Sequence, residues 1–511
     1  MRRLKKRCLS LLRMQTVLNY LLWFFLLHII LLAVFIVYQS MKDEYPTTKN
    51  LPLYNEQQDH IPSNDIHFRI STQEVLIREI IDSQRYDIHI SIAKGKGPPK
   101  LSFSKNKRWI PPKIVKDVHS MKRSFTKYVY VHAEYTEQMS MATLSLLSLC
   151  GFAQFGDRKV VRPYTRDSRI TSNERNTRSL GVLYDLDYLG NLLNNAGYSP
   201  LVDKQEYLNE CKPTDPNHVT IHFLYIGGVT KNWNLGKFKI TEDVYDNIFA
   251  KTKATGWTDC SFLDNLMKIT PSKRQYCINP TIIKDWRVLE RDIVNGAKCL
   301  NIILWRGIGG GKYRSYFTEE HIKYSHTVLQ YALKPSITVQ HEVTKFQQAF
   351  LQDRYIAVYI RAELVLIPHR FDIDLFRNCL NVVVDVVAAL KTITGINLVY
   401  LASDMSKYGS GSLLRNYLGS SENKTNPFPE IFSSLKSRIG GVVYDYNPLN
   451  TEIVDRGAIA LVDWSLLSHA QYLVTAGDEE MSSFVRLVIG SFLTNHQDDK
   501  ELWSKISVCG K

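Results

Sequence analysis

Cysteine is scarce in this chain, with eight in 511 residues. So thin a distribution excludes a disulfide scaffold as the basis of the fold. The sequence contains no C-x-x-C and no cluster of metal ligands with zinc spacing. Pairing cannot be deduced from sequence, but we expect one or two disulfides, with Cys260 joined to Cys277 or to Cys299 as candidates.

Charged side chains are missing from one long segment, and internal repeats are absent throughout. Between Met14 and Met41 the sequence has no Asp, Glu, Lys or Arg, and His28 is the only histidine. The apolar residues 17–38 within this segment are numerous enough to cross a bilayer as a helix. Basic residues favour the cytoplasmic side, and six precede the segment: Arg2, Arg3, Lys5, Lys6, Arg7 and Arg13. The sequence therefore predicts a cytoplasmic tail at 1–16, a signal-anchor helix at 17–38 and a translocated body.

A cleaved signal peptide is the alternative for the same segment. Signal peptides have apolar regions of about 7–15 residues that end in a small-residue cleavage site. The apolar run here is longer, and no such site follows Tyr38. We therefore expect a single-pass type II protein, with Golgi or endoplasmic reticulum as its membrane.

The body is basic, since the whole chain has a net charge of +14 and six of these charges stand before the apolar segment. A translocated body makes a nucleic-acid partner an unsuitable interpretation. A basic surface suits an anionic nucleotide-sugar donor or acidic glycans. The only N-glycosylation sequon begins at Asn423, in a polar stretch where such acceptors lie.

The chain divides by composition into a stem and two alternating series. Residues 39–122 are polar and proline-rich, as expected of a stem, although part of them could form a small helix or hairpin. Strands then alternate with helices in two series, which predicts an α/β fold with two Rossmann-like domains that face a cleft. We assign 123–335 to an N-terminal, acceptor-side domain and 336–511 to a C-terminal, nucleotide-sugar-binding domain.

Polar side chains stand at three predicted strand ends of the second series. The strand "YIAVYI" is followed by Arg361, the strand "LVYLAS" by Asp404, and the strand "QYLVTAG" by a loop to Ser482 and Ser483. Ligands of open parallel sheets bind outside the carboxyl ends of the strands, and helix N-termini suit phosphate oxygens. Arg361 could hold a diphosphate, and Asp404 could accept a hydrogen bond from a base or a ribose hydroxyl.

Each of these side chains also has an ordinary structural role open to it. Arg361 could form a salt bridge with Glu363, and Asp404 could cap a helix. Ser482 and Ser483 could be first-turn residues of a helix without any ligand.

Taken together, these stretches resemble the GDP-fucose-dependent protein O-fucosyltransferases and the wider fucosyltransferase-like group of GT-B glycosyltransferases. The resemblance covers roughly 125–495 and includes "VYVHAEYTEQ", "YIAVYIRAE", "LVYLASD" and "AGDEEMSSF". It implies transfer of fucose from GDP-fucose to a protein or glycan hydroxyl, with no metal or other cofactor. It implies that Arg361 assists departure of GDP and that six residues contact the donor: Gln138, Tyr359, Asp404, Ser482, Ser483 and Phe484.

The chain departs from the family pattern at two places. Tyr359 stands where the family has histidine, and the loop "AEYTEQ" contains no glycine. Glu134 or Glu137 of this loop could act as the general base on an acceptor hydroxyl, and the alternative for both is a solvated loop carboxylate.

Two rival functions remain open. A metal-dependent GT-A glycosyltransferase would use Asp185 and Asp187 as metal ligands, and Asp372 with Asp374 repeats the tripeptide at a predicted helix start. A non-catalytic luminal nucleotide-sugar or glycan-binding protein would keep the fold without the activity.

The sequence also contains a glycine-rich stretch, Trp305 to Tyr316, that lacks the spacing of a phosphate loop. We expect it to be a loop lining the cleft, with Arg306 and Arg314 facing acceptor or diphosphate.

Overall fold

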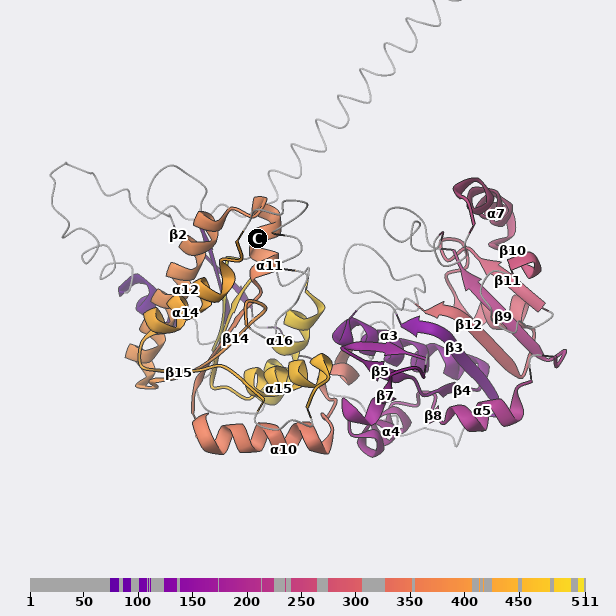
Figure 1. Cartoon of the computed structure of the whole chain (residues 1–511), viewed down its shortest axis with the longest axis horizontal. Helices are drawn as coiled ribbons and strands as arrows, with labels where there is room; N and C mark the ends of the chain where they lie inside the picture. Colours follow the sequence, from indigo (N-terminus) through magenta and orange to yellow (C-terminus); the bar gives the residue numbers. More distant parts are fainter. Residues whose placement is uncertain are drawn as a thin grey trace, which may run out of the picture. The chain divides into compact units, whose positions relative to one another are not determined.

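A computed structural model gives the fold (Figure 1). The chain separates into two compact units, residues 1–61 and residues 62–511, and every described residue lies in the second. The predicted tail, membrane helix and first part of the stem lie outside the described residues. The structure describes residues 74–81, 86–92, 101–107, 109, 111, 124–135, 138–172, 174–212, 214–224, 235, 240–263, 274–305, 327–351, 354–406, 413, 417, 425–448, 453–477, 482–497 and 504–509.

Seven of the described strands form one sheet, in the order β15-β14-β13-β16-β17-β1-β2. All neighbours in it run parallel except β1 and β2. Their bounds are β1 Tyr86–Ile92, β2 Leu101–Lys107, β13 Ile356–Ile360, β14 Leu398–Ser403, β15 Val442–Tyr444, β16 Tyr472–Ala476 and β17 Ser504–Val508.

Both faces of this sheet are covered, which is why its central strands are apolar throughout rather than alternating. Ile356, Val358 and Ile360 of β13 share a core with the helices of one face, while Ala357 and Tyr359 belong to the core of the other face. The first face holds α11 Ala362–Leu366, α12 Ile373–Thr394 and α14 Phe428–Ile439; the second holds α10 Ile337–Phe346, α15 Arg456–Ser468 and α16 Ser483–Asn495.

Part of the predicted stem belongs to this sheet, which corrects the assignment of 39–122 to a spacer. Residues 74–81 are helical, and β1 and β2 form an antiparallel hairpin. β1 pairs in parallel with β17, the last of the described strands, with Ile88 opposite Ile506. Ile88 and Ile90 are buried in the same core as α12, so the hairpin is a part of the folded body.

The remaining described strands form a second sheet around β3, the strand predicted from "KYVYVH". Its order is β10-β11-β9-β12-β3-β6-β5-β7, with β4 beside β3 and β8 beside β4. The bounds are β3 Lys127–Tyr135, β4 Arg158–Val161, β5 Tyr164–Arg166, β6 Arg169–Thr171, β7 Arg178–Ser179, β8 Leu201–Val202, β9 His218–Phe223, β10 Trp257–Asp259, β11 Arg274–Ile278 and β12 Cys299–Trp305.

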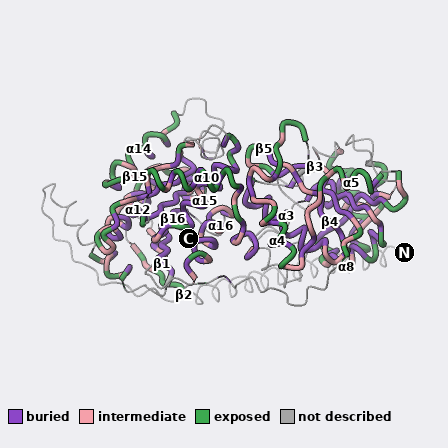
Figure 2. The backbone as a smooth tube through the Cα atoms, turned by 90° about the horizontal axis from the view of Figure 1, so that it is seen from below, coloured by how far each residue is buried: buried purple, intermediate pink, exposed green. Residues whose placement is uncertain are grey.

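The helices of this second half include one that is buried along its whole length, α3 Met139–Ala153. It is apolar and, extended to Gly156, long enough to cross a membrane, but it lies inside the folded body. Figure 2 shows the contrast with exposed helices such as α5 and α14. The other helices are α4 Leu186–Asn195, α5 Lys204–Glu210, α7 Glu242–Thr255 and α8 Trp286–Val288, and short 3₁₀ or π-helical turns occupy Gln154–Gly156, Leu180–Val182, Ser261–Leu263, Leu289–Val294, Gln347–Leu351 and Ile367–His369.

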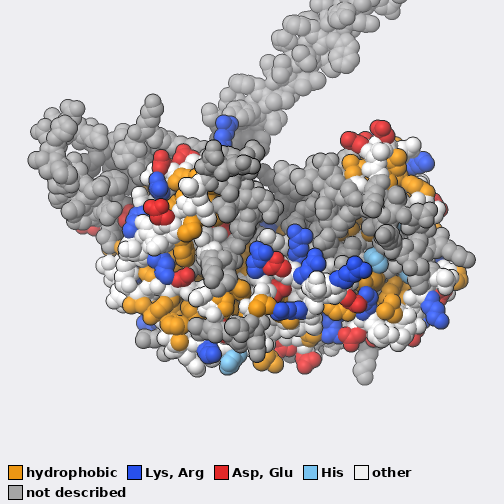
Figure 3. Space-filling model, viewed as in Figure 1, with side chains coloured by type: hydrophobic (Ala, Val, Ile, Leu, Met, Phe, Trp, Pro, Cys, Tyr) orange, Lys and Arg blue, Asp and Glu red, His pale blue; other side chains and the backbone are white. Residues whose placement is uncertain are grey.

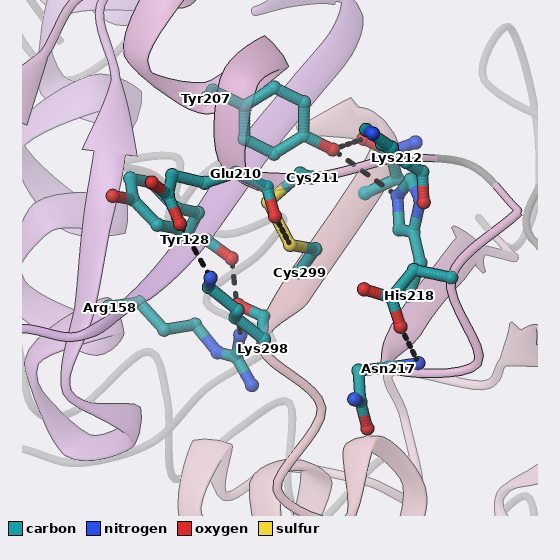
Figure 4. Close-up of a disulfide and its surroundings, with 12 residues drawn as sticks. Tyr128, Arg158, Tyr207, Glu210, Cys211, Lys212, Asn217, His218, Lys298 and Cys299 are labelled. Atoms are coloured by element: carbon teal, nitrogen blue, oxygen red, sulfur yellow. Dashed lines mark hydrogen bonds and ion pairs between the residues drawn. A yellow bond between two sulfur atoms is a disulfide. The ribbon is translucent and has the colours of Figure 1, made fainter.

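Three disulfides connect six of the described cysteines. Cys260–Cys277 is one of the two pairings expected for Cys260, while Cys299 pairs with Cys211 and Cys379 with Cys509. The bond between Cys211 and Cys299 ties the end of α5 to the start of β12 (Figure 4). Beside it the Tyr207 hydroxyl donates to Asn301 at 2.9 Å. Cys150 is a buried thiol on α3.

The predicted α/β class with parallel sheets is therefore confirmed, and the predicted alternation of strands and helices is present in both halves. The element from "YIAVYI" is β13, and that from "QYLVTAG" is β16. The predicted domain boundary between 335 and 336 stays a prediction.

Candidate functional site

The candidate site lies where the central strands of the seven-stranded sheet end. β13 pairs in parallel with β14 on one side and with β16 on the other. The residues that follow them are Arg361, Asp404 and the turn at Gly477. Parallel pairing places the three strand ends at one edge of the sheet, as the sequence predicted.

Asp404 is fixed by contacts with the turn that follows β13. Its side chain is 1% exposed and accepts hydrogen bonds from the backbone N–H groups of Ala362, at 2.7 Å, and Glu363, at 3.1 Å. These are first-turn donors of α11, so Asp404 caps that helix from a neighbouring strand. Burial raises the pKa of the Asp404 carboxyl above its ordinary value, although the Arg361 charge and both N–H groups oppose that shift.

Arg361 lies between two carboxylates. Its guanidinium is 2.9 Å from Glu363 and 3.3 Å from Asp404, and its side chain is 18% exposed. Burial by itself lowers the pKa of Arg361, but the Tyr359 hydroxyl and both carboxylates raise it above its ordinary value. The salt bridge considered for Arg361 and Glu363 thus exists, and the three charged side chains together carry one net negative charge.

Gly477 allows the end of β16 to approach this cluster. Its φ is +122°, and a Cβ there would lie 3.1 Å from the Arg361 carbonyl oxygen. The Arg361 N–H in turn donates to the Ala476 carbonyl at 2.9 Å. A side chain at 477 would be strained by its own backbone and would press on the turn that holds Arg361.

The Ser-Ser-Phe stretch begins α16, and each residue has a distinct contact. Ser482 is the N-cap, and its hydroxyl accepts the Val485 N–H at 3.2 Å. The Ser483 hydroxyl lies 2.7 Å from the Ser140 hydroxyl of α3. The Phe484 ring packs against the Tyr359 ring at a centroid distance of 5.5 Å.

The contact between Ser140 and Ser483 joins the first turns of two helices. Gln138 precedes α3 as an exposed N-cap residue, and Ser140 is the second residue of that helix. α3 has 15 residues and α16 has 13, so both are long enough to carry a substantial dipole. Two positive helix ends therefore meet at one point, an arrangement that stabilises an anion such as a phosphate group.

The two aspartate pairs considered as metal ligands lie at helix N-termini, where the first member of each pair is the N-cap. Asp185 is the N-cap of α4 and accepts the Tyr188 N–H at 3.0 Å, while Asp187 lies in its first turn. Asp372 caps α12, and Asp374 follows in its first turn, as expected of acids at a helix N-terminus. Within the described part of the chain, no group of three or more His, Cys, Asp or Glu side chains could hold a metal ion.

Several predicted residues lie outside the described residues, namely Glu137, Arg306, Arg314 and Asn423, and so does the side chain of Glu134. Sequence reasoning missed Ser140, whereas the helix-capping role considered for Asp404 is confirmed at the start of α11. Ser140 follows Gln138 by two residues, in a helix whose first turns contain several small residues. A serine in such a position is too common to indicate a functional role.

Comparison with known proteins gives distant structural similarity and no match in sequence. No family model and no curated protein sequence matches the chain. It is similar to POFUT1 in complex with GDP-fucose, at 12% identity and a TM-score of 0.43, over 76% of this chain and 99% of that one. It is similar to the fucosyltransferase NodZ from Bradyrhizobium, at 14% identity and a TM-score of 0.32, over 71% and 92% of the two chains.

Proposed function

We propose that the chain is a glycosyltransferase of GT-B type that transfers fucose from GDP-fucose to a hydroxyl of a protein or glycan. The observation that carries the proposal is the link between the end of β13 and the paired N-termini of α3 and α16. The ring of Tyr359, two residues before Arg361, packs on Phe484, and the neighbouring Ser483 contacts Ser140. Positive charge and helix dipoles gathered at strand ends suit the diphosphate of a nucleotide sugar.

The chemistry required of the site is stabilisation of a leaving group. As the bond between the sugar C1 and the diphosphate oxygen breaks, negative charge grows on the diphosphate and the sugar becomes oxocarbenium-like. Groups that are already oriented toward that charge lower the barrier, and each is worth about 10²–10³ in rate. The helix N-termini and Arg361 would supply this stabilisation without a metal.

Arg361 can stabilise the leaving diphosphate only if the diphosphate replaces one of its two carboxylate partners. Its cluster with Glu363 and Asp404 is net negative, which opposes a diphosphate. Asp404 is tied to the start of α11 by two backbone N–H groups, so Glu363 is the carboxylate that would give way. Asp404 would then hold the guanidinium in position while its free edge binds the donor.

The remaining predicted roles belong to the same proposal. Tyr359 and Phe484 would form an aromatic wall of the donor site, and Glu134 or Glu137 would act as base on the acceptor hydroxyl. The basic tail and the apolar segment 17–38 would anchor the protein in a Golgi or endoplasmic reticulum membrane, with its body in the lumen.

The experiment measures GDP release from GDP-fucose and thermal stabilisation of the full-length protein by GDP. We expect GDP to raise Tm, because a ligand that binds only the folded state stabilises it by mass action. Arg361→Ala should lower turnover by about 100-fold or more. Arg377→Ala, which removes an exposed arginine of α12, is the matched control and should leave both measurements unchanged.

The double pairing of Arg361 favours a second candidate, a nucleotide-sugar-binding protein without activity. It predicts stabilisation by GDP but no GDP release with any acceptor. If neither GDP nor GDP-fucose raises Tm, both candidates are wrong.

A further inference from the structure

A turn of the second sheet is held against a helix of the seven-stranded sheet. The hairpin of β5 and β6 ends in a two-residue turn, Asp167 and Ser168, between the paired residues Arg166 and Arg169. This turn contacts the start of α15, which covers one face of the seven-stranded sheet. Figure 3 shows acidic and basic side chains intermixed in the region where Figure 1 labels β5. The hairpin therefore connects the two sheets through its tip.

Both residues of the turn have a backbone conformation that favours glycine. The φ angles are 49° for Asp167 and 67° for Ser168, in the left-handed region that a type I′ hairpin turn uses. Two such residues cost free energy that other contacts must offset. Successive backbone N–H groups of a turn can also form a concave site for an anion. The turn is therefore suited to an anionic partner and would be strained without one.

The carboxylate of Asp455 is this partner. Asp455 is the N-cap of α15, and its side chain is buried. Its Oδ2 accepts the N–H of Asp167 at 2.8 Å, while its Oδ1 accepts those of Ser168, at 3.1 Å, and Gly457, at 2.7 Å. A Cβ on Gly457 would lie 3.1 Å from the Ser168 Cα, so the two backbones approach closely. One carboxylate thus binds donors of the hairpin and of the helix at once.

Arg456 adds a second contact at the surface. Its guanidinium donates two hydrogen bonds to the Asp167 carboxylate, both at 2.7 Å. Both side chains are about half exposed, so this ion pair contributes little by itself. The buried carboxylate of Asp455, whose bonds to N–H groups are charge-assisted, is the stronger contact.

The hairpin contact belongs to a closed ring of four elements. β6 contacts α3, and α3 meets α16 where the Ser140 hydroxyl lies 2.7 Å from the Ser483 hydroxyl. α16 packs on α15, where the Trp464 indole N–H donates to Ser491 at 2.9 Å. α15 returns to the hairpin through Asp455. Because the ring is closed, loosening the hairpin contact also frees the junction between the starts of α3 and α16.

We propose that Asp455 is a positioning residue for the diphosphate of the donor. By holding the hairpin tip, it keeps the start of α3 against the start of α16. This inference rests on the proposed function, which places the diphosphate at those two helix starts. Without the hairpin contact each helix still forms, but its start is no longer held against the other. A phosphate group then has the stabilisation of one helix dipole instead of two.

The variant Asp455→Asn breaks one of the three contacts selectively. With its amide oxygen in the place of Oδ1, asparagine still accepts the N–H groups of Gly457 and Ser168, so the cap of α15 remains. Its NH₂ group then faces the N–H of Asp167, which sets a donor against a donor. The variant therefore weakens the hairpin contact without removing the helix.

The matched control is Asp372→Asn. Asp372 is exposed and caps α12 through one oxygen alone, so it also loses its charge and keeps its cap. The full-length protein is assayed for GDP affinity and, without nucleotide, for amide hydrogen exchange by mass spectrometry. Asp455→Asn should weaken GDP binding about fivefold, the effect of about one hydrogen bond, and speed exchange at the starts of α3 and α16. The control should change both by less than about 1.5-fold.

Ser168→Gly supplies a rescue. Glycine adopts the φ of 67° without strain, so the turn depends less on Asp455. Asp455→Asn/Ser168→Gly should therefore regain most of the lost GDP affinity. Faster exchange confined to the hairpin would overturn the proposal, and so would equal GDP affinities of Asp455→Asn and the wild type. A wild-type protein that binds no GDP would overturn the proposed function, and with it the role of Asp455 toward a diphosphate.

Discussion

Two arginines at strand ends, one in each sheet, differ in how firmly their side chains are held. Arg158 begins β4 of one sheet, and Arg361 follows β13 of the other. Arg158, which begins β4, is 0% exposed and makes a two-pronged pair with Glu290 at 2.7 and 2.8 Å. It also donates to the Tyr128 carbonyl at 3.1 Å. Arg361, by contrast, is 18% exposed, and its carboxylate partners are single contacts at 2.9 and 3.3 Å.

The difference separates a structural arginine from one that can change partner. Glu290 is itself held by the Trp286 indole N–H at 3.0 Å, so the pair with Arg158 is saturated on both sides. Glu363 follows Arg361 by two residues, and its carboxylate accepts a hydrogen bond from the Arg361 guanidinium at 2.9 Å. We therefore expect loss of Arg158 to affect folding and loss of Arg361 to affect ligand binding.

The largest effect should come from Arg158→Met. It leaves the Glu290 carboxylate buried without its cation, and breaking a buried pair in this way costs about 3–5 kcal/mol. The measurement is the free energy of unfolding by denaturant. Arg291→Met, an exposed arginine in the same region, is the control and should change it by less than about 0.5 kcal/mol. A small loss for Arg158→Met would remove the distinction between the two arginines.

The next largest effect on stability should come from Asp463, a carboxyl group whose strongest interactions include no cation. Burial raises the pKa of Asp463 from 3.8 to about 7, and the Tyr400 hydroxyl donates to it. The folded state therefore holds a proton that the unfolded state has lost between about pH 4 and pH 7, so stability falls as pH rises through that window. Asp463→Asn should be more stable than wild type above pH 7, by about 1–2 kcal/mol, and nearly equal near pH 4.

Tm measured across that range for both proteins tests this dependence. Asparagine keeps an oxygen to accept from Tyr400, so the comparison isolates the charge. Parallel curves for the two proteins would mean that Asp463 does not titrate in this window.

Glu363→Gln tests whether Arg361 changes partner. It removes one negative charge and loosens one contact of the guanidinium, so GDP should bind about five- to tenfold more tightly. Calorimetric titration with GDP measures the affinity. Glu430→Gln, at an exposed acid of α14, is the control. Weaker binding in Glu363→Gln would mean that Glu363 supports Arg361 in its binding position.

The smallest effect concerns the hydroxyl contact that joins the starts of α3 and α16. Ser140→Ala and Ser483→Ala, singly and together, form a double-mutant cycle. We expect a coupling of about 0.5–1 kcal/mol in the free energy of unfolding, typical of a neutral hydrogen bond. Bound GDP should change that coupling if the anion lies between the two helix ends, and an unchanged value would place it elsewhere.

The strands and helices near the candidate site could be predicted because their sequences are locally consistent. β13 is an apolar run of five buried residues, and α12 begins at a capping aspartate and ends at Gly395 in a left-handed conformation. The strand-end rule for parallel sheets then brought Arg361, Asp404 and the start of α16 to one edge. These inferences need only neighbouring residues and the handedness of the fold.

The parts that were missed depend on contacts between distant residues. No feature of the sequence near Ser140 indicates its contact with Ser483, which is 343 residues away. The strands β5 to β7 are two or three residues long, too short for an alternating pattern to identify them. The hairpin β1–β2 looked like a spacer because its partner β17 is at the other end of the chain.

That last pairing has a consequence for biosynthesis. A ribosome makes residues 86–92 long before residues 504–508, yet β1 lies against β17 in the finished sheet, with the Cys509 N–H donating to the Ile90 carbonyl at 2.9 Å. β1 must therefore stay without this neighbour until residues 504–508 have been made. Closing so long a loop is slow, and a waiting apolar strand is exposed to aggregation. The residues of β17 thus complete the sheet, since the edge of β1 that they pair with is covered only after they have been made.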